Sequence, residues 1–203
     1  GELAATTAKY RRDILGQKVV LLDPFQVLKE QGVEHITPNV YNPLEFLDVE
    51  KPSFIDDVYE IADAMVIREL RDPHFPEIAM TYIRCVIMHM MTRPKLREEA
   101  NLVKMRGLAM GAISTDDSAE KYTSNMQTLI DEMVTSDKLN GVIARNAAMI
   151  GEMGDREFGS LLSTVSRNTA FLDGADIEQC LTGPSTFDPR TIKSTPTTVY
   201  LVL

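Results

Sequence analysis

The sequence has no tryptophan, only two cysteines, and an aromatic content of 6%. With so few aromatic side chains, the chain is poorly equipped to stack successive bases of a single-stranded nucleic acid. The two cysteines, Cys85 and Cys180, lie within apolar helical patterns and lack the spacing of a disulfide framework. This cysteine usage favours a reducing, cytoplasmic compartment.

Long hydrophobic runs are absent as well. The longest strongly apolar stretch, residues 85–91, is interrupted by His89 and is far shorter than the ~20 residues that cross a bilayer. We therefore expect no direct membrane contact. The first eight residues have neither the basic nor the apolar region of a signal peptide. Because the chain begins with Gly1-Glu2 and no methionine, we expect that it starts inside a longer protein.

The chain is also poor in positive charge. Its 21 lysine and arginine residues are outnumbered by 30 aspartate and glutamate residues, which gives a net charge of −9. This balance opposes tight nonspecific binding of phosphates, which depends on cationic side chains that release counterions. A hydrophobic content of 44% and a charged content of 25% are ordinary for a globular protein. The length of 203 residues suits one domain or slightly more.

Nucleotide-binding and catalytic motifs are missing too. No Gly-x-x-x-x-Gly-Lys-Ser/Thr loop occurs, so the backbone cradle and phosphate-binding lysine of a P-loop are lacking. The histidines, His35, His74 and His89, form no pattern typical of a nucleophile and its base. Cys85 and His89 have the spacing of two metal ligands on one helix face, but no second pair accompanies them, which favours core packing. We predict no catalytic, cofactor-binding or metal-binding residue and no enzymatic activity for this chain.

The two ends of the sequence have α/β character. Residues 1–15 are predicted to form a helix that ends at Gly16. One face of this helix carries Leu3, Thr7, Tyr10 and Ile14. The aliphatic and β-branched run at residues 18–22 predicts a buried strand, followed by a loop over residues 25–47. Residues 197–203 predict a second buried strand.

Between these ends the apolar residues recur at helical spacing. The predicted helices cover residues 53–70, 78–93, 96–110, 122–133, 139–150, 155–172 and 173–181, with a polar break at residues 114–117. The helix at residues 78–93 is apolar over most of its circumference, which is typical of a bundle centre. Its methionines are either core residues, which the pattern favours, or an adaptable partner surface; they are Met80, Met88, Met90 and Met91. The predicted fold class is mainly α, a helical bundle flanked by partial α/β elements.

One predicted helix, which Asp155 is expected to cap, carries a candidate binding surface. Its polar face holds Arg156, Ser160, Ser163, Arg167 and Asn168. Arginine and hydroxyl groups of this kind suit phosphates or a protein tail, although a solvated helix face explains the same pattern.

Four short segments together resemble one protein family. They are Gly1-Glu2-Leu3-Ala4, Leu22-Asp23-Pro24-Phe25, Tyr41-Asn42-Pro43-Leu44 and Thr198-Val199-Tyr200-Leu201-Val202-Leu203. In this order they are similar to segments of the coupling proteins of type IV secretion and conjugation systems, the TraG-like ATPases.

The resemblance implies a domain organisation. Residues 1–50 correspond to part of a RecA-like α/β NTPase domain, residues 51–188 to an inserted all-α domain, and residues 189–203 to the strand that returns to the motor. The P-loop and the acidic motif of the family fall outside this sequence, so we expect ATP and Mg²⁺ to bind the parent protein and no cofactor to bind this fragment. The parent is expected to be a membrane-anchored homo-hexamer, with this part on the cytoplasmic side of the bacterial inner membrane.

The resemblance also implies a function. In such proteins the all-α domain recruits cargo for the motor, namely a relaxase, a relaxosome accessory protein or an effector protein. An acidic surface suits basic protein partners. The alternative is direct binding of single-stranded DNA by the face with Arg156 and Arg167. A third hypothesis is purely structural, with the domain packing against neighbouring subunits of the ring.

Overall fold

A computed structural model describes residues 1–68, 73–113 and 122–202. The chain divides into two compact units. The α/β unit comprises Gly1–Glu45 and Asp173–Leu203, and the helical unit comprises Phe46–Leu172. The sequence placed the boundaries after residues 50 and 188, whereas the units divide after residues 45 and 172. Most of the described residues are helical, which confirms the predicted mainly α class.

The α/β unit is built on two strands from opposite ends of the sequence. Its elements are α1 (Glu2–Asp13), β1 (Lys18–Leu22), α2 (Val27–Glu30), α10 (Ala175–Leu181), the 3-10 helix η4 (Pro189–Lys193) and β2 (Thr197–Leu201). The strands β1 and β2 pair in parallel, in register from Lys18 opposite Thr197 to Leu22 opposite Leu201. Parallel strands cannot be joined by a tight hairpin and need a long crossover connection. Here the entire helical unit lies within that connection.

Helix α1 packs onto the strands through its smallest side chains. Ala4 and Ala8 are buried, and Ala4 joins the core cluster of this unit with Leu21, Leu28 and Val202. The face carrying Leu3, Tyr10 and Ile14, which the sequence singled out, is exposed instead. Alanine allows the helix backbone to approach the strands closely, so the apolar pattern alone identified the wrong face. Helix α1 ends at Asp13, two residues before the predicted end, and Ile14 is its C-cap. Gly16 follows in the turn with a left-handed φ of 62°.

Two further expectations for this unit are corrected. Residues 25–47 were predicted to be loop, but they include the short helix α2. The buried carboxylate of Asp23 stabilises the start of this helix, because it accepts hydrogen bonds from the amides of Val27 and Leu28, both at 3.0 Å. Strand β2 was predicted to be buried, but its side chains alternate. Val199 and Leu201 are exposed, while Tyr200 donates or accepts a 2.6 Å hydrogen bond with Thr7 of α1.

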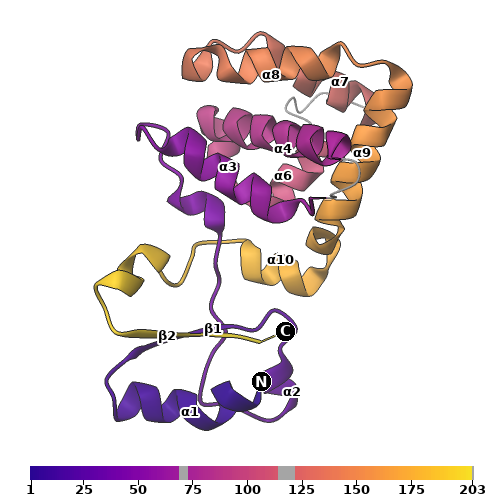
Figure 1. Ribbon diagram of the computed structural model, residues 1–203. Helices are drawn as coiled ribbons and strands as arrows, with labels where there is room; N and C mark the ends of the chain where they lie inside the picture. Colours follow the sequence, from indigo (N-terminus) through magenta and orange to yellow (C-terminus); the bar gives the residue numbers. More distant parts are fainter. Residues whose placement is uncertain (69–72, 114–121, 203) are drawn as a thin grey trace. The chain divides into compact units, whose positions relative to one another are not determined.

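The helical unit is organised around one apolar helix. Its elements are α3 (Phe54–Met65), α4 (His74–Thr92), α5 (Pro94–Arg97), α6 (Leu102–Ala109), α7 (Tyr122–Val134), α8 (Val142–Gly151) and α9 (Asp155–Thr169), with the 3-10 helices η1 (Pro43–Phe46), η2 (Lys138–Gly141) and η3 (Ala170–Asp173) at its borders and turns. Helix α4 packs against α3, α5, α6, α8 and α9 (Figure 1). The methionines of α4 are buried, namely Met80, Met88, Met90 and Met91. The predicted bundle centre is confirmed, and these methionines are core residues.

Several helix boundaries differ from those predicted. Helix α3 ends at Met65, five residues before the expected end, and the predicted helix at residues 96–110 is divided into α5 and α6. The division occurs because the Asn101 side chain caps α6 by accepting a hydrogen bond from the Lys104 amide at 2.8 Å. Leu139, expected to belong to a helical stripe, has a left-handed φ of 53° in the turn before α8. The polar break at residues 114–117 lies outside the described residues.

Within the described ranges, no helix combines the length and the apolar character needed to cross a membrane.

Candidate partner-binding surface

Helix α9 presents one face to the bundle and the opposite face to solvent. Asp155 and Glu157 lie in its first turn, where carboxylates interact favourably with the positive end of the helix dipole. Gly154, and not the predicted Asp155, occupies the capping position. Leu161 and Val165 bury the inner face against the bundle. Figure 1 shows α9 running crosswise to α4 and α8, so that its outer face lies at the edge of the helical unit.

Four of the five predicted site residues form a continuous row on the outer face. Arg156, Ser160, Ser163 and Arg167 follow the spacing i, i+4, i+7 and i+11, which at 100° per residue confines them to an arc of about 60°. We call this row the α9 stripe. Three of its members are exposed and Ser160 is half-buried. With a rise of 1.5 Å per residue, the α-carbons of Arg156 and Arg167 are about 16 Å apart.

The two serines of the α9 stripe use their hydrogens within the helix. Ser160 Oγ donates to the Arg156 carbonyl at 3.0 Å, and Ser163 Oγ donates to the Gly159 carbonyl at 2.9 Å. A hydroxyl group has one donor hydrogen and two acceptor lone pairs. Between its two arginines the α9 stripe therefore offers acceptors to a partner.

A surface hollow lies at each end of the α9 stripe. The first, the N-terminal hollow, has a volume of about 510 Å³ and is lined by Phe75, Gly154, Asp155, Arg156, Glu157 and Ser160. The second, the C-terminal hollow, has a volume of about 530 Å³ and is lined by Met65, Ile67, Arg167, Asn168 and Phe171. The N-terminal hollow contains two carboxylates beside one arginine, whereas the lining of the C-terminal hollow is apolar apart from Arg167 and Asn168. The two ends of the surface therefore differ in charge.

Asn168, the fifth predicted site residue, does not belong to the exposed surface. It is only 9% exposed, and both ends of its amide are used within the fold. Its Oδ1 accepts a hydrogen bond from the Ile67 amide at 2.9 Å, and its Nδ2 donates to the Thr164 carbonyl at 2.8 Å. The side chain thus ties α9 to the residues that follow α3, and we assign it a structural role.

Replacing Asn168 by alanine is expected to lower the free energy of unfolding by about 1 to 3 kcal/mol, because the Ile67 amide loses a buried acceptor. Urea denaturation followed by circular dichroism measures this change. The exposed Ser163→Ala substitution on the same helix serves as the control and is expected to cost less than about 0.5 kcal/mol. Equal stability of the two variants would contradict the structural role.

Comparison with models of known protein families shows which family this chain belongs to. The family model described as type IV secretory system conjugative DNA transfer matches residues 1–203. The chain belongs to this family. A search of the curated proteins finds no match. The family predicted from the sequence is confirmed, and the protein has a role in conjugative DNA transfer by a type IV secretory system.

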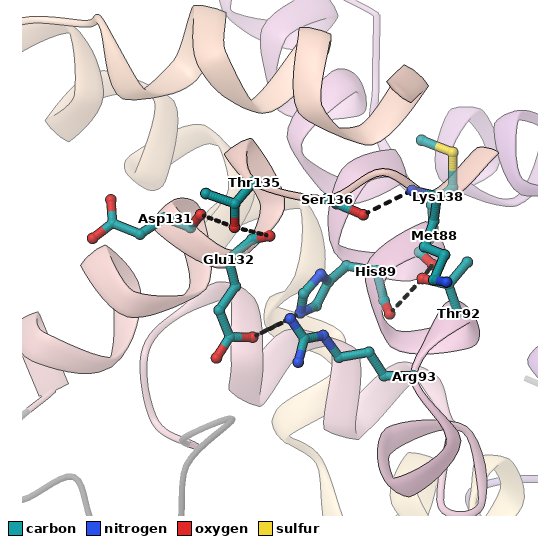
Figure 2. Close-up of polar contacts among 9 residues, drawn as sticks. All are labelled: Met88, His89, Thr92, Arg93, Asp131, Glu132, Thr135, Ser136 and Lys138. Carbon is teal, nitrogen blue, oxygen red and sulfur yellow. Dashed lines mark hydrogen bonds and ion pairs between the residues drawn. The ribbon is translucent and has the colours of Figure 1, made fainter. Parts of the chain in front are cut away.

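The Cys85 and His89 pair of this conjugative DNA transfer protein lies inside the bundle. Burial raises the pKa of the Cys85 thiol to about 12, which keeps it protonated. Glu132 of α7 points toward His89 of α4 and toward Arg93, the residue that follows α4 (Figure 2). Its Oε2 lies 3.2 Å from His89 Nε2 and 3.1 Å from Arg93 Nη2. Across the parts of the chain that the structure describes, no group of three or more His, Cys, Asp or Glu side chains is placed to hold a metal ion.

The pKa of His89 is lowered from 6.5 to about 4, first by burial and then by the nearby Arg93 guanidinium, while Glu132 opposes both effects. At neutral pH the imidazole is therefore uncharged, and its Nε2–H donates to the Glu132 carboxylate. No sequence pattern indicated this contact, because His89 and Glu132 belong to helices that only the tertiary structure brings together.

The sequence also missed the apolar part of the candidate surface in this family member. Ile67 and Phe171 lie more than a hundred positions apart, and both line the C-terminal hollow. Ile67 follows the end of α3 and was expected to continue that helix. Its position after the helix end could be recognised only once the boundary of α3 was known.

Proposed function

We propose that the helical unit of this conjugative DNA transfer protein recruits a protein cargo through the α9 stripe. The cargo is a relaxase, a relaxosome accessory protein or an effector protein. The observation that carries the proposal is the inward orientation of the Ser160 and Ser163 hydroxyl hydrogens, which leaves acceptors on the outer face.

A polypeptide matches this surface better than a DNA backbone does. Peptide groups provide N–H donors for the serine oxygens, whereas the phosphates of DNA only accept hydrogen bonds. To bind a phosphate, Ser160 and Ser163 must give up the hydrogen bonds to their own helix. The net charge of −9 also weakens the long-range attraction of a polyanion.

Single-stranded DNA is the second candidate ligand. One observation favours it: Arg156 and Arg167 lie on the same face of α9, about 16 Å apart, so that both can contact one strand. Binding of this kind is driven by counterion release, and it weakens steeply as the salt concentration rises.

In this proposal the α/β unit is part of a RecA-like motor domain and the helical unit is inserted into it. The parallel pairing of β1 with β2 supports the insertion, because the helical unit lies within the connection between these two strands. Hydrolysis of ATP with Mg²⁺ belongs to other parts of a membrane-anchored, homo-hexameric parent, and this chain by itself is not an enzyme. The absence of a P-loop motif from this sequence supports the assignment of ATP hydrolysis to other parts of the parent protein. The proposed location is the cytoplasmic side of the bacterial inner membrane.

The double substitution Arg156→Ala with Arg167→Ala is expected to weaken binding of the relaxase from the same transfer system by roughly tenfold or more, because both charged ends of the surface are lost. Biolayer interferometry with the immobilised chain measures the dissociation constant. Lys95→Ala with Arg97→Ala removes two exposed cationic residues from α5 and serves as the matched control with unchanged affinity.

The same sensor distinguishes the two candidate ligands. Recruitment of protein predicts no measurable binding of a single-stranded oligonucleotide at moderate salt. Salt-sensitive oligonucleotide binding that Arg156→Ala and Arg167→Ala abolish would favour the DNA alternative. Self-association of the chain with neither ligand bound would favour a contact between subunits.

A further inference from the structure

Strand β2 has one edge that the described part of the chain leaves without a strand partner. The Val202 amide, just after β2, donates to the Leu22 carbonyl of β1 at 2.9 Å, so Val202 faces β1. The backbone groups of successive strand residues point alternately to the two edges of a strand. The N–H and C=O groups of Val199 and Leu201 therefore point away from β1, toward the free edge.

The outer edge of β1, by contrast, is closed by a side chain. The Leu21 amide donates to Asn39 Oδ1 at 2.8 Å, and the Leu21 carbonyl accepts a hydrogen bond from the Asn39 amide at 2.7 Å. Thr186 holds the Asn39 side chain in place, because its Oγ1 accepts a hydrogen bond from Asn39 Nδ2 at 2.7 Å. A further strand beside β1 would have to displace Asn39, so the sheet is open to extension at β2.

The contacts of α1 show that one of its faces lies beyond β2. Ala4 belongs to the same core cluster as Leu21 of β1. About 60° further around the helix, Thr7 forms a 2.6 Å hydrogen bond with Tyr200 of β2. A further rotation of about 20° to 60° in the same direction leads to three apolar residues, which we call the α1 stripe: Ile14, Leu3 and Tyr10. The α1 stripe therefore overhangs the free edge of β2.

The α1 stripe is uncovered over the length of a strand. Leu3 is 75% exposed, Tyr10 is 55% exposed and Ile14 is 68% exposed. Apolar side chains of this size are rarely left in water together unless they form a binding site. From Leu3 to Ile14 the helix rises about 16 Å, which corresponds to about five residues of extended chain. Strand β2 has the same length, five residues.

We propose that the free edge of β2, together with the α1 stripe, binds a third strand from the motor domain of the same polypeptide. The backbone of this strand pairs with the outward groups of Val199 and Leu201, and the side chains on one of its faces contact the α1 stripe. The inference rests on the proposed function, in which the α/β unit is part of a larger motor domain, and it specifies the edge at which that domain continues the sheet.

The surroundings of this edge define the chemistry of the third strand. One of its faces lies against the α1 stripe, and its other face lies beside the exposed side chains of Val199 and Leu201. Strands with apolar neighbours on both faces belong mostly to parallel sheets and consist of nearly continuous apolar residues. Strands β1 and β2 already run in parallel. We therefore expect a parallel strand of about five residues, rich in valine, isoleucine and leucine and without proline.

Hydrogen exchange at single-residue resolution, on this chain alone and on the full-length parent protein, tests the inference. The Val199 and Leu201 amides are expected to exchange at least about a hundredfold more slowly in the parent, because the third strand supplies acceptors for them. The Tyr200 amide faces β1 and serves as the internal control, protected in both proteins. Equally fast exchange of Val199 and Leu201 in both proteins would overturn the inference. Protection that rises with the concentration of the isolated chain would assign the edge to a second copy and reject a strand of the same polypeptide.

Lysine substitutions separate the α1 stripe from the fold of this chain. Leu3→Lys with Ile14→Lys changes two exposed positions, so the urea midpoint of the isolated chain is expected to stay the same. In the parent the same variant is expected to abolish the protection of Val199, because the lysines would be buried against an apolar strand. Met149→Lys, at a 47% exposed apolar position on α8, is the matched control and leaves both measurements unchanged. Protection of Val199 that survives Leu3→Lys with Ile14→Lys would contradict the role of the α1 stripe.

The outcomes also separate this inference from the recruiting role. If Val199 and Leu201 remain unprotected in the parent while relaxase binding still depends on Arg156 and Arg167, recruitment through the α9 stripe stands and the third strand is wrong. If both amides are protected in the parent while relaxase binding ignores both arginines, the third strand stands and recruitment through the α9 stripe fails.

Discussion

The chain is expected to lose on the order of 3 kcal/mol of stability as the pH falls from 6.5 toward 4, because His89 is buried without a charge. The figure corresponds to the lowering of its pKa from 6.5 to about 4 in the folded state. Between these pH values His89 is protonated in the unfolded chain but remains neutral in the folded chain, so protonation favours unfolding. Above pH 6.5 both states leave the imidazole neutral, so this contribution is fully present there.

The physical cause lies in the surroundings of His89. The side chain is 1% exposed, and a protonated imidazole there would lie near the Arg93 guanidinium, although the Glu132 carboxylate would partly offset that repulsion. Desolvation is the larger cost, since a charged ring loses its contact with water. Acidification is therefore expected to weaken the packing between α4 and α7.

Urea denaturation at a series of pH values measures this effect, and His89→Gln isolates it. The variant keeps a donor for Glu132 but does not titrate, so the difference in stability between the parent chain and the variant is expected to change across the window from 6.5 to about 4. His74→Gln is the matched control, because His74 is exposed and contacts Glu157 at 3.3 Å. A parallel pH dependence for the parent chain and His89→Gln would contradict the assignment.

Replacing Met88 by alanine is expected to lower the free energy of unfolding by about 2 to 5 kcal/mol. Met88 is fully buried in α4, the helix that contacts most of the other helices of its unit. Truncation removes apolar contacts and leaves a cavity that the surrounding helices fill only in part. The expected loss is a large fraction of the stability of an ordinary domain.

Urea denaturation of Met88→Ala and of a control variant, Met149→Ala, measures this loss. Met149→Ala changes a methionine of the same unit that is 47% exposed on α8, and its expected cost is less than about 0.5 kcal/mol. If Met88→Ala unfolded at the same urea concentration as Met149→Ala, the central position of α4 would be wrong. The pair also tests whether the methionines of α4 serve packing or an adaptable surface.

The sequence predicted features that depend on neighbours along the chain. Strand β1 has the expected bounds, and the apolar circumference of α4 identified the bundle centre. The spacing of Arg156, Ser160, Ser163 and Arg167 placed them on one face of α9, because a helix fixes the angle between its residues. Where local signals competed, prediction failed: Asn101 divides the helix expected at residues 96–110 by capping α6.

Burial was harder to predict than helix position. Asn168 was expected on the exposed face because asparagine is usually exposed, yet its amide is used by Ile67 and Thr164. Likewise, Ala4 and Ala8 form the inner face of α1, although the side chains of Leu3 and Tyr10 have more apolar surface to bury. A single sequence does not show how closely two elements approach, and close approach favours small side chains.

The sequence by itself determined the family, the mainly α class and the row of residues on α9, since these follow from short motifs and from the fixed periodicity of a helix. The tertiary structure alone decided that β1 pairs with β2, that Glu132 meets His89, and that Ile67 and Phe171 line one hollow with Arg167. These residues are separated by tens to more than a hundred positions. Their proximity depends on how the helices pack, which no local pattern encodes.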